Sequence, residues 1–312
     1  MKKIILASAI ALGGAIALAA PSYADDMLYF PVIAKGFNHQ FWQAVKAGAE
    51  QAAKEDGVKI TFEGPNTEAE IDKQIDILNA AFAKKPSGLG FAALDTKAED
   101  KALKQFFDAK IPIVAFDSGV ANDMPLSTCT TDNVNAAGAA ADKLAEAIGD
   151  EGEVAAEIHD QTSATGIGRR DGFLNRMKEK HPKIKIVDVK YANDDVKAAD
   201  DIKATFASHP NLKGIFASNE GTAIGLTVAI KETKSKVVGV GYDSGKKQKA
   251  AILDGTLLGS ITQNPVGIGK CVVDSLSKAI KGEKLEKVID TGFYWYDKSN
   301  MTDPKVAAVL YD

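Results

Sequence analysis

A pattern of aromatic residue, Asp, Ser and Gly occurs twice in the chain, each time after an apolar run of strand length. It reads Phe-Asp-Ser-Gly at residues 116–119 and Tyr-Asp-Ser-Gly at residues 242–245. A continuous Val- and Ile-rich run is typical of a buried parallel strand, and α/β sheets bind ligands beyond the carboxyl ends of their strands. The repeat therefore predicts two similar α/β lobes that aim Asp117 and Asp243 at one cleft. Asp-Ser-Gly is also ordinary turn and helix-cap sequence, so either copy alone could be structural.

The chain between and around these copies alternates strand-like runs with helical periodicity. This βαβ alternation predicts an α/β fold with two doubly wound parallel sheets. No Pro/Ser-rich linker separates the halves, and an aromatic segment at residues 293–296 remains after the last unit, so we expect several chain crossings in a multi-strand hinge.

One helix is expected to start from a capping box of Thr67 and Glu70. Strands are predicted at 27–34, 58–63, 88–93, 111–116, 153–159, 185–191, 214–218, 237–242 and 257–262. Helices are predicted near 41–52, 71–82, 97–109, 167–179, 196–207, 221–232, 245–254 and 266–281.

The first 24 residues have the pattern of an export signal. Lys2 and Lys3 precede an apolar run at residues 4–20, and Ser22-Tyr23-Ala24 has the small-x-small form of a cleavage site. We expect cleavage after Ala24, with an uncleaved anchor as the alternative. The formal net charge of −4 lacks the basic footprint of a nucleic-acid-binding protein, so we expect no nucleic-acid partner.

The two cysteines, Cys129 and Cys271, could form a disulfide in an oxidising compartment, but their positions in the sequence leave this open. Together with the four histidines at 39, 159, 181 and 209, they have no metal-ligand spacing. We predict no metal and no cofactor.

Two helix starts carry candidate binding residues. Phe41 and Trp42 follow the first strand, and because neighbouring helical residues point in different directions, we expect one to face the core and the other the cleft. Burial of both in the core is the alternative. Arg169 and Arg170 begin a later helix, and Phe173, four residues after Arg169, can pack inward while an Arg reaches the cleft. A solvated surface pair of arginines is the alternative.

Amides end two further predicted strands. Asn219 could contact a ligand or only cap the next helix. In Gln263-Asn264-Pro265, Pro265 suits a first helical position, which makes Asn264 the expected cap and leaves Gln263 free.

The residue types at these strand ends indicate a sugar or polyol site. Asp, Asn, Gln and Arg have flat groups that can hydrogen-bond two neighbouring hydroxyls, and aromatic faces cover the C–H side of a sugar ring. Motifs of phosphate loops, dinucleotide binding, nucleophile elbows and zinc proteases are absent from the sequence. Asp117 and Asp243 could in principle be a glycosidase pair. The two-lobe architecture gives that idea no support, so we predict no catalysis.

The chain resembles the ribose-binding-protein-like sugar-binding proteins of ABC importers, a family of type I periplasmic binding proteins. The likeness spans the mature chain through ordered motifs at residues 41–42, 116–117, 131–133, 169–173, 216–220, 238–243 and 262–265. By this resemblance the sugar contacts are Phe41, Trp42, Asp117, Arg169, Asn219, Asp243 and Gln263, with His39 as a further candidate. Ser118, where ribose binders tend to have Arg, and Asn193-Asp194, where an aromatic contact is common, depart from the pattern and leave the sugar unnamed.

The resemblance also implies the organisation and the partners. Residues 25–131 plus 264–290 would form an N-terminal lobe and residues 132–263 plus 291–312 a C-terminal lobe, with hinge crossings near Asp132, Gln263 and Asp290. The protein would be a periplasmic monomer that closes around a monosaccharide or polyol and docks on an inner-membrane ABC permease. The alternative is a signalling or chemotaxis receptor for a sugar or a furanose-like autoinducer, with a chemoreceptor as partner. A transcriptional repressor of the same fold would need a helix-turn-helix where this chain has its export signal.

Overall fold

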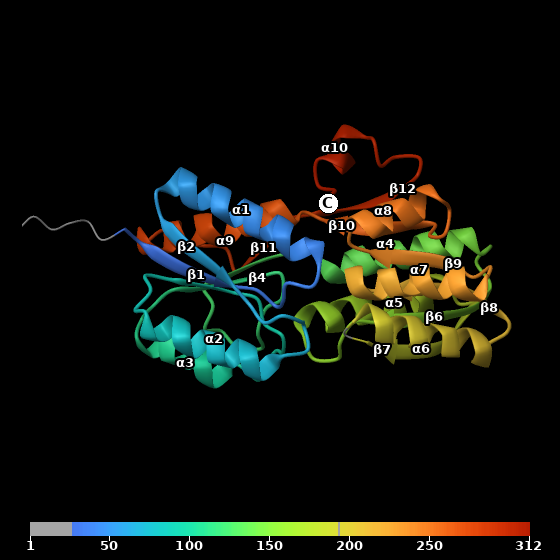
Figure 1. Ribbon diagram of the computed structural model, residues 1–312, viewed down its shortest axis with the longest axis horizontal. Coiled ribbons are helices and arrows are strands. Elements are labelled where there is room, and N and C mark those ends of the chain that lie inside the picture. The colour runs from blue at the N-terminus through green and yellow to red at the C-terminus, as the bar shows by residue number, and fades with distance from the viewer. Residues whose placement is uncertain (1–26, 193) are drawn as a thin grey trace, which may run out of the picture.

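The computed structural model describes residues 27–192 and 194–312, and the predicted export signal lies outside them. Two α/β lobes lie side by side along the long axis of the molecule, and the C-terminus lies between them (Figure 1). Each lobe is built on a sheet of six strands within the described residues. None of the helices in this part of the chain is both long enough and apolar enough to cross a membrane. Two lobes with doubly wound sheets, as predicted from the sequence, are confirmed.

The first lobe, called the N lobe here, has the strand order β2-β1-β3-β4-β5-β11, with all neighbours parallel. Its strands are β1 (Tyr29–Ile33), β2 (Lys59–Glu63), β3 (Leu89–Phe91), β4 (Ile113–Phe116), β5 (Ser127–Thr130) and β11 (Val288–Asp290). Its helices are α1 (Gln40–Asp56), α2 (Ile71–Ala83), α3 (Asp100–Asp108) and α9 (Pro265–Ile280).

The second lobe, the C lobe, repeats this winding in the order β7-β6-β8-β9-β10-β12, with β12 antiparallel at the edge. Its strands are β6 (Gly152–Ile158), β7 (Ile184–Tyr191), β8 (Leu212–Ala217), β9 (Val238–Tyr242), β10 (Gly259–Gln263) and β12 (Phe293–Asp297). Its helices are α4 (Asn133–Ala147), α5 (Ala164–Lys180), α6 (Asp195–Ser208), α7 (Glu220–Thr233), α8 (Lys246–Leu253) and α10 (Pro304–Ala307).

The chain passes between the lobes at three places in the described residues: from β5 to α4, from β10 to α9 and from β11 to β12. The connections touch one another. Asp290 accepts a hydrogen bond from the backbone N–H of Asp132, and Asn264 donates to the carbonyl of Thr291. Three adjacent connections restrict relative motion of the lobes to bending about one axis more strongly than one linker would.

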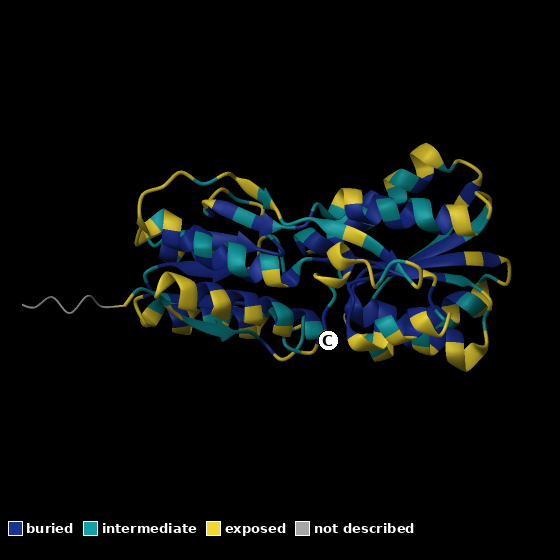
Figure 2. Cartoon of the chain, turned by 90° about the horizontal axis from the view of Figure 1, so that it is seen from above, coloured by how far each residue is buried: buried dark blue, intermediate teal, exposed yellow. Residues whose placement is uncertain are grey.

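Each sheet buries apolar side chains on both faces, because residues alternate between the faces of a strand. In β1, Phe30 and Val32 join the core under α1 and α9, whereas Ile33 joins the core under α2 and α3. Figure 2 shows the resulting pattern, with buried strands inside both lobes and exposed residues on the outer helix faces. Each lobe therefore has its own apolar cores, and Tyr311 from the C-terminal segment joins the N-lobe core beside Phe41.

Several details of the sequence-based prediction differ from the structure, among them the strands β11 and β12, which cover residues for which no strand is predicted. The strand β5 was not predicted, because Ser127-Thr128-Cys129-Thr130 is short and mostly polar. Thr67 does not cap α2: the helix begins at Ile71, and the Glu70 carboxylate accepts hydrogen bonds from the backbone N–H and the hydroxyl of Thr67. The Thr67–Glu70 pair closes a turn that precedes the helix.

Cys129 and Cys271, left open from the sequence, form a disulfide with a Cα–Cα distance of 6.0 Å. The bond joins β5 to α9. Both elements belong to the N lobe, but β5 comes before the main C-lobe segment in the sequence and α9 comes after it. It closes a segment with a sequence separation of 142 residues.

Replacing both cysteines, Cys129→Ala with Cys271→Ala, should lower the free energy of unfolding of the N lobe by about 3 kcal/mol, because a long closed loop restricts the unfolded chain. The measurement is denaturant unfolding in a Trp295→Phe background, followed by the fluorescence of Trp42, which is buried in the N-lobe core. Wild-type protein treated with a reductant should unfold like the variant. An unchanged N-lobe transition in both samples would contradict this expectation.

Candidate functional site

One cavity between the lobes contains all eight residues predicted as contacts. The space left in it has a volume of only about 10 Å³, far below the roughly 300–1,000 Å³ typical of sites for drug-sized ligands, so the side chains of the two lobes nearly fill it. The residues come from the carboxyl ends of strands in both sheets and from the helices that follow. The cavity is lined by Lys35, His39, Phe41, Trp42, Glu68, Asp117, His159, Thr165, Arg169, Asn219, Asp243 and Gln263.

The two repeated aspartates occupy the same unusual backbone conformation. Asp117 follows β4 with a φ of 54°, and Asp243 follows β9 with a φ of 78°. Only Gly, and to a lesser degree Asp and Asn, adopt this left-handed region readily, and such strain clusters at functional positions. The sharp turn after each strand places both carboxyl groups at the cavity, each 4% exposed.

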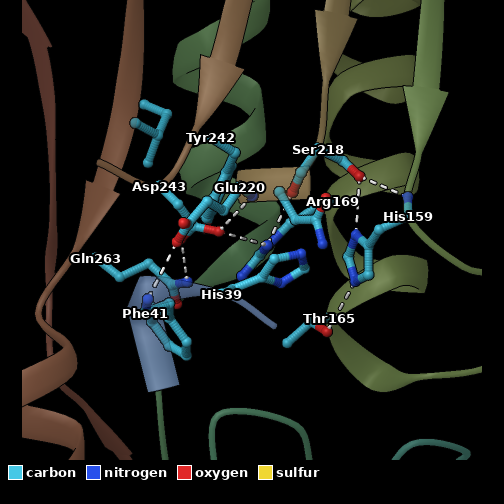
Figure 3. A network of polar contacts seen from close by, with 12 residues as sticks. His39, Phe41, His159, Thr165, Arg169, Ser218, Glu220, Tyr242, Asp243 and Gln263 are labelled. Atoms are coloured by element: carbon cyan, nitrogen blue, oxygen red, sulfur yellow. Dashed lines mark hydrogen bonds and ion pairs between the residues drawn. The ribbon is translucent and has the colours of Figure 1, made fainter. Parts of the chain in front are cut away.

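The carboxylate of Asp243 is held by neighbours in the C lobe, as Figure 3 shows. Gln263 Nε2 donates to Oδ1 at 2.7 Å, and the backbone N–H of Glu220 donates to Oδ2 at 3.0 Å. Arg169 Nη1 lies 3.9 Å from Oδ2. Burial raises the pKa of Asp243, and Arg169 and the Gln263 hydrogen bond oppose that rise. The group is thus oriented before any ligand arrives.

Asp117 differs, because its carboxylate accepts no hydrogen bond from any residue that the structure describes. Burial raises the pKa of Asp117 to about 6, although the positive charges of Lys35 and Arg169 act against that rise. Its carboxylate group lines the cavity and is not held by a neighbouring donor among the described residues. Asp117 is therefore the carboxylate in the cavity that keeps its hydrogen-bonding capacity unused.

Arg169 is buried rather than solvated. Its Nη1 donates to the carbonyl of Ser218 at 2.8 Å, and its Nε donates to Asn133 Oδ1 at 2.7 Å. Its guanidinium lies 3.7 Å from the centre of the Tyr242 ring, a cation–π contact. The surface interpretation applies to its neighbour Arg170 only, which pairs with Asp171 at the surface.

The surroundings of Arg169 partly agree with the sequence-based expectation. Phe173 packs inward, as predicted, and stacks on Phe216 with ring centres 4.7 Å apart. The helix α5 already begins at Ala164, so Arg169 lies in its second turn and not at its start. Ser163 caps the helix through a bond from the Gly166 N–H, which explains the earlier beginning.

The expectation that only one of Phe41 and Trp42 would reach the cleft is wrong. Both side chains belong to the N-lobe core, and both line the cavity. The first turn of α1 lies at the cavity, so its side chains border both the core and the cleft. Trp42 Nε1 donates to Glu68 Oε1 at 2.7 Å, and the two aromatic rings meet edge to face with centres 4.9 Å apart.

Asn219 and Gln263 combine structural contacts with a place at the cavity. Asn219 Oδ1 accepts the N–H of Thr222 and caps α7, so the capping interpretation and the cavity position both hold. Gln263 Oε1 accepts from Thr131 Oγ1 at 3.0 Å, while its nitrogen holds Asp243. Asn264 caps α9 and Pro265 occupies its first position, as predicted.

Four lining residues were missed from the sequence: Lys35, Glu68, His159 and Thr165. Lys35, Glu68 and His159 each follow a strand at its carboxyl end, and that position was the available signal. They were passed over because charged residues in loops usually lie in solvent.

Lys35 reaches across the cavity from the N lobe into the C lobe. Its Nζ lies 3.3 Å from Thr165 Oγ1 and 3.6 Å from Glu68 Oε2, and 3.7 Å from Asp160 Oδ2. Burial alone would lower the pKa of Lys35, but the carboxylates of Glu68 and Asp160 outweigh it and raise that pKa. Lys35 is a buried ammonium shared between the lobes.

The pKa values of the two histidines that line the cavity shift in opposite directions. Burial lowers the pKa of His159 to about 3, so its ring is neutral and contacts Ser218 Oγ and Thr165 Oγ1. Burial also opposes the charged form of His39, but Glu68, 3.3 Å from its Nδ1, outweighs it and raises the pKa. Within residues 27–192 and 194–312, no group of three or more His, Cys, Asp or Glu side chains is placed to hold a metal ion.

This combination of fold and cavity places the chain in a known family. A family model described as periplasmic binding protein domain matches residues 30–284, so the chain belongs to that family. The D-allose-binding periplasmic protein of Escherichia coli (strain K12) is 28% identical over 271 residues, covering 83% of this chain and 86% of that protein.

Solved structures with bound sugars are also similar. A carbohydrate transporter solute-binding protein from Agrobacterium radiobacter in complex with D-arabinose has 33% identity and a TM-score of 0.86, covering 91% of this chain and 99% of that chain. An ABC transporter solute-binding protein from Agrobacterium vitis with bound D-fucose has 33% identity and a TM-score of 0.87, covering 91% and 100%.

Glu68→Gln should destabilise the N lobe by about 2 kcal/mol at pH 7, because it leaves the Lys35 ammonium buried with less compensating charge. The folded protein holds the pKa of Glu68 well below its usual 4.5, since Lys35 and His39 outweigh the effect of burial. The stabilisation is therefore complete above pH 4.5 and is lost as the pH falls through the folded pKa. Denaturant unfolding of wild type and variant between pH 3 and pH 7 measures the difference in their free energies of unfolding at each pH.

Glu63→Gln is the matched control, because Glu63 pairs with Lys84 in a partly exposed position at the end of β2. Its effect should stay below about 1 kcal/mol. In the double variant Lys35→Met with Glu68→Gln, part of the stability should return. If Glu68→Gln lowered the free energy of unfolding no more than Glu63→Gln does, the prediction that the buried Lys35–Glu68 pair stabilises the N lobe would be contradicted.

Proposed function

We propose that this protein is an exported solute-binding protein that captures a monosaccharide or related polyol between its lobes. It carries the sugar through the periplasm to the permease of an ABC-type importer and performs no catalysis itself. The observation that carries the proposal is the buried carboxylate of Asp117, which has no hydrogen-bond partner among the described residues and faces a cavity of polar groups.

The chemistry of the cavity supports a neutral, hydroxyl-rich ligand. Asp117 and Asp243 accept hydrogen bonds, Arg169 donates them, and Asn219 and Gln263 carry amide groups. Phe41 and Trp42 add aromatic surface for the C–H face of a sugar ring. The carboxylates of Asp117 and Asp243 face the cavity and would repel an anionic ligand.

The burial of the site supports a mechanism in which the lobes open and close. Every one of the eight predicted contacts is at most 6% exposed, so a ligand cannot enter while the lobes are together. We infer that the hinge opens to admit the sugar, and that the sugar then stabilises the closed form by its contacts to both lobes. The closed form would be the one that a permease recognises.

A bound sugar should raise the melting temperature of the protein. At a hundredfold excess over Kd it adds about 2.7 kcal/mol, a shift of roughly 5–10 °C for a chain of this size. The measurement is a thermal-shift screen of D-ribose, D-allose, D-arabinose, D-fucose, D-tagatose and polyols. A panel without any shift would contradict the sugar assignment.

Asp117→Asn and Asp243→Asn should each remove most of that shift, because each deprives the site of a charged acceptor while Asn still tolerates the left-handed backbone. Asp108→Asn, at an exposed position on α3 paired with Lys104, is the control and should keep the full shift. Retention of the shift in both cavity variants would argue against these two carboxylates as ligand contacts.

A further inference from the structure

Glu220 places its carboxylate at the start of a helix in the other lobe. It is the first residue of α7 in the C lobe, yet it accepts hydrogen bonds from the backbone N–H groups of Gln40 and Phe41, each at 3.1 Å. These two residues begin α1 in the N lobe, and the N-cap residue of that helix, His39, makes no side-chain capping bond to the described residues. Since the first N–H groups of a helix lack partners inside it, Glu220 supplies the missing cap from across the cleft.

Gln40 does the same in the opposite direction. Its Oε1 accepts the backbone N–H of Lys246 at 2.8 Å, and Lys246 is the first residue of α8 in the C lobe. The N-cap residue of α8 is Gly245, which has no side chain to offer. Each lobe thus presents an incompletely capped helix start and a side chain that caps the helix of the other lobe.

Gly245 gives independent evidence that this contact needs close approach. A Cβ atom on Gly245 would lie 2.7 Å from Glu220 Oε1 and 3.1 Å from Gln40 Oε1, the two capping oxygens. Its φ of −58° is open to any residue, so the backbone conformation does not require glycine. The absence of a side chain at 245 is what lets both oxygens reach their helices.

The contact is linked directly to the cavity. The backbone N–H of Glu220 donates to Asp243 Oδ2, and the capped residue Phe41 lines the cavity. Tyr311, near the C-terminus, donates to Glu220 Oε2 at 3.3 Å and packs its ring on Phe41. Figure 3 shows the carboxylate of Glu220 between Asp243 and the helix start at Phe41.

We propose that Gln40 and Glu220 form a reciprocal latch that holds the closed lobes together. This rests on the proposed function, because a latch acts only in a binder whose lobes separate. In the open form the capped N–H groups and both side chains return to water, so the latch stabilises the closed form alone. Gln40 and Glu220 are then positioning residues that raise ligand affinity without touching the ligand.

The test compares sugar affinity with the stability of the ligand-free protein. The probe is the sugar from the panel above that gives the largest thermal shift, titrated calorimetrically. Glu220→Gln keeps the shape but removes the charge, and should weaken binding by roughly tenfold, with faster dissociation. Gln40→Ala removes the other half of the latch and should weaken binding by about fivefold. Gly245→Ala inserts a methyl group between the two oxygens and should also weaken binding.

Matched controls lie on the same two helices. Glu232→Gln, at the far end of α7, and Gln51→Ala, on the exposed side of α1, should leave the affinity within twofold. The melting temperature of ligand-free Glu220→Gln and Gln40→Ala should equal that of wild type. An equal loss of stability with and without sugar would overturn the latch, because the caps would then be permanent.

The outcomes separate the latch from the function on which it rests. Sugar binding by wild type that neither latch substitution weakens overturns the latch and leaves the proposed function intact. A wild-type protein that binds no sugar of the panel overturns the proposed function, and the latch with it.

Discussion

Polar and charged side chains that reach from one lobe into the other link the two halves of this molecule. Lys35 extends from the N lobe to Asp160 and Thr165 of the C lobe, and Glu220 extends from the C lobe to the start of α1. A buried charge without partners costs several kcal/mol. The two lobes keep separate apolar cores, so their shared surface is polar and can be hydrated when they part. Closure then depends on restoring polar contacts, a condition that a hydroxyl-rich ligand can satisfy.

The two copies of the repeated motif share a left-handed backbone conformation at the Asp but differ in the hydrogen bonds of its carboxylate. Both Asp117 and Asp243 lie in the left-handed region after a central strand. Asp243 is held by Gln263 and by the Glu220 N–H, whereas Asp117 accepts nothing from the part of the chain described. One carboxylate is thus oriented by the protein and the other awaits a partner. Under the proposed function, this asymmetry makes Asp117 in the N lobe the carboxylate whose hydrogen bonds come from the ligand.

Sequence patterns succeeded where a residue's role depends on its own neighbours in the chain. The continuous apolar runs of β4 and β9 marked central strands, and Asn264 with Pro265 marked the start of α9. Sequence patterns failed where a residue's role depends on its neighbours in the folded structure. The short strand β5 has a mostly polar sequence, and Lys35 and Glu68 look like surface residues until the fold surrounds them. Phe41 and Trp42 both reach the cavity because α1 begins there, which periodicity alone does not indicate.

The sequence by itself determined the α/β class, the presence of two lobes, and an Asp at the end of a central strand in each. These follow from local hydrophobic patterning and turn chemistry, which act over a few residues. Only the tertiary structure decided the Cys129–Cys271 bond, the ion pair of Lys35 with Asp160 and the exchange of caps between Gln40 and Glu220. Those contacts join segments more than a hundred residues apart, and no local pattern specifies which distant groups will meet. Their energies depend on burial, and burial exists only once both sheets have formed.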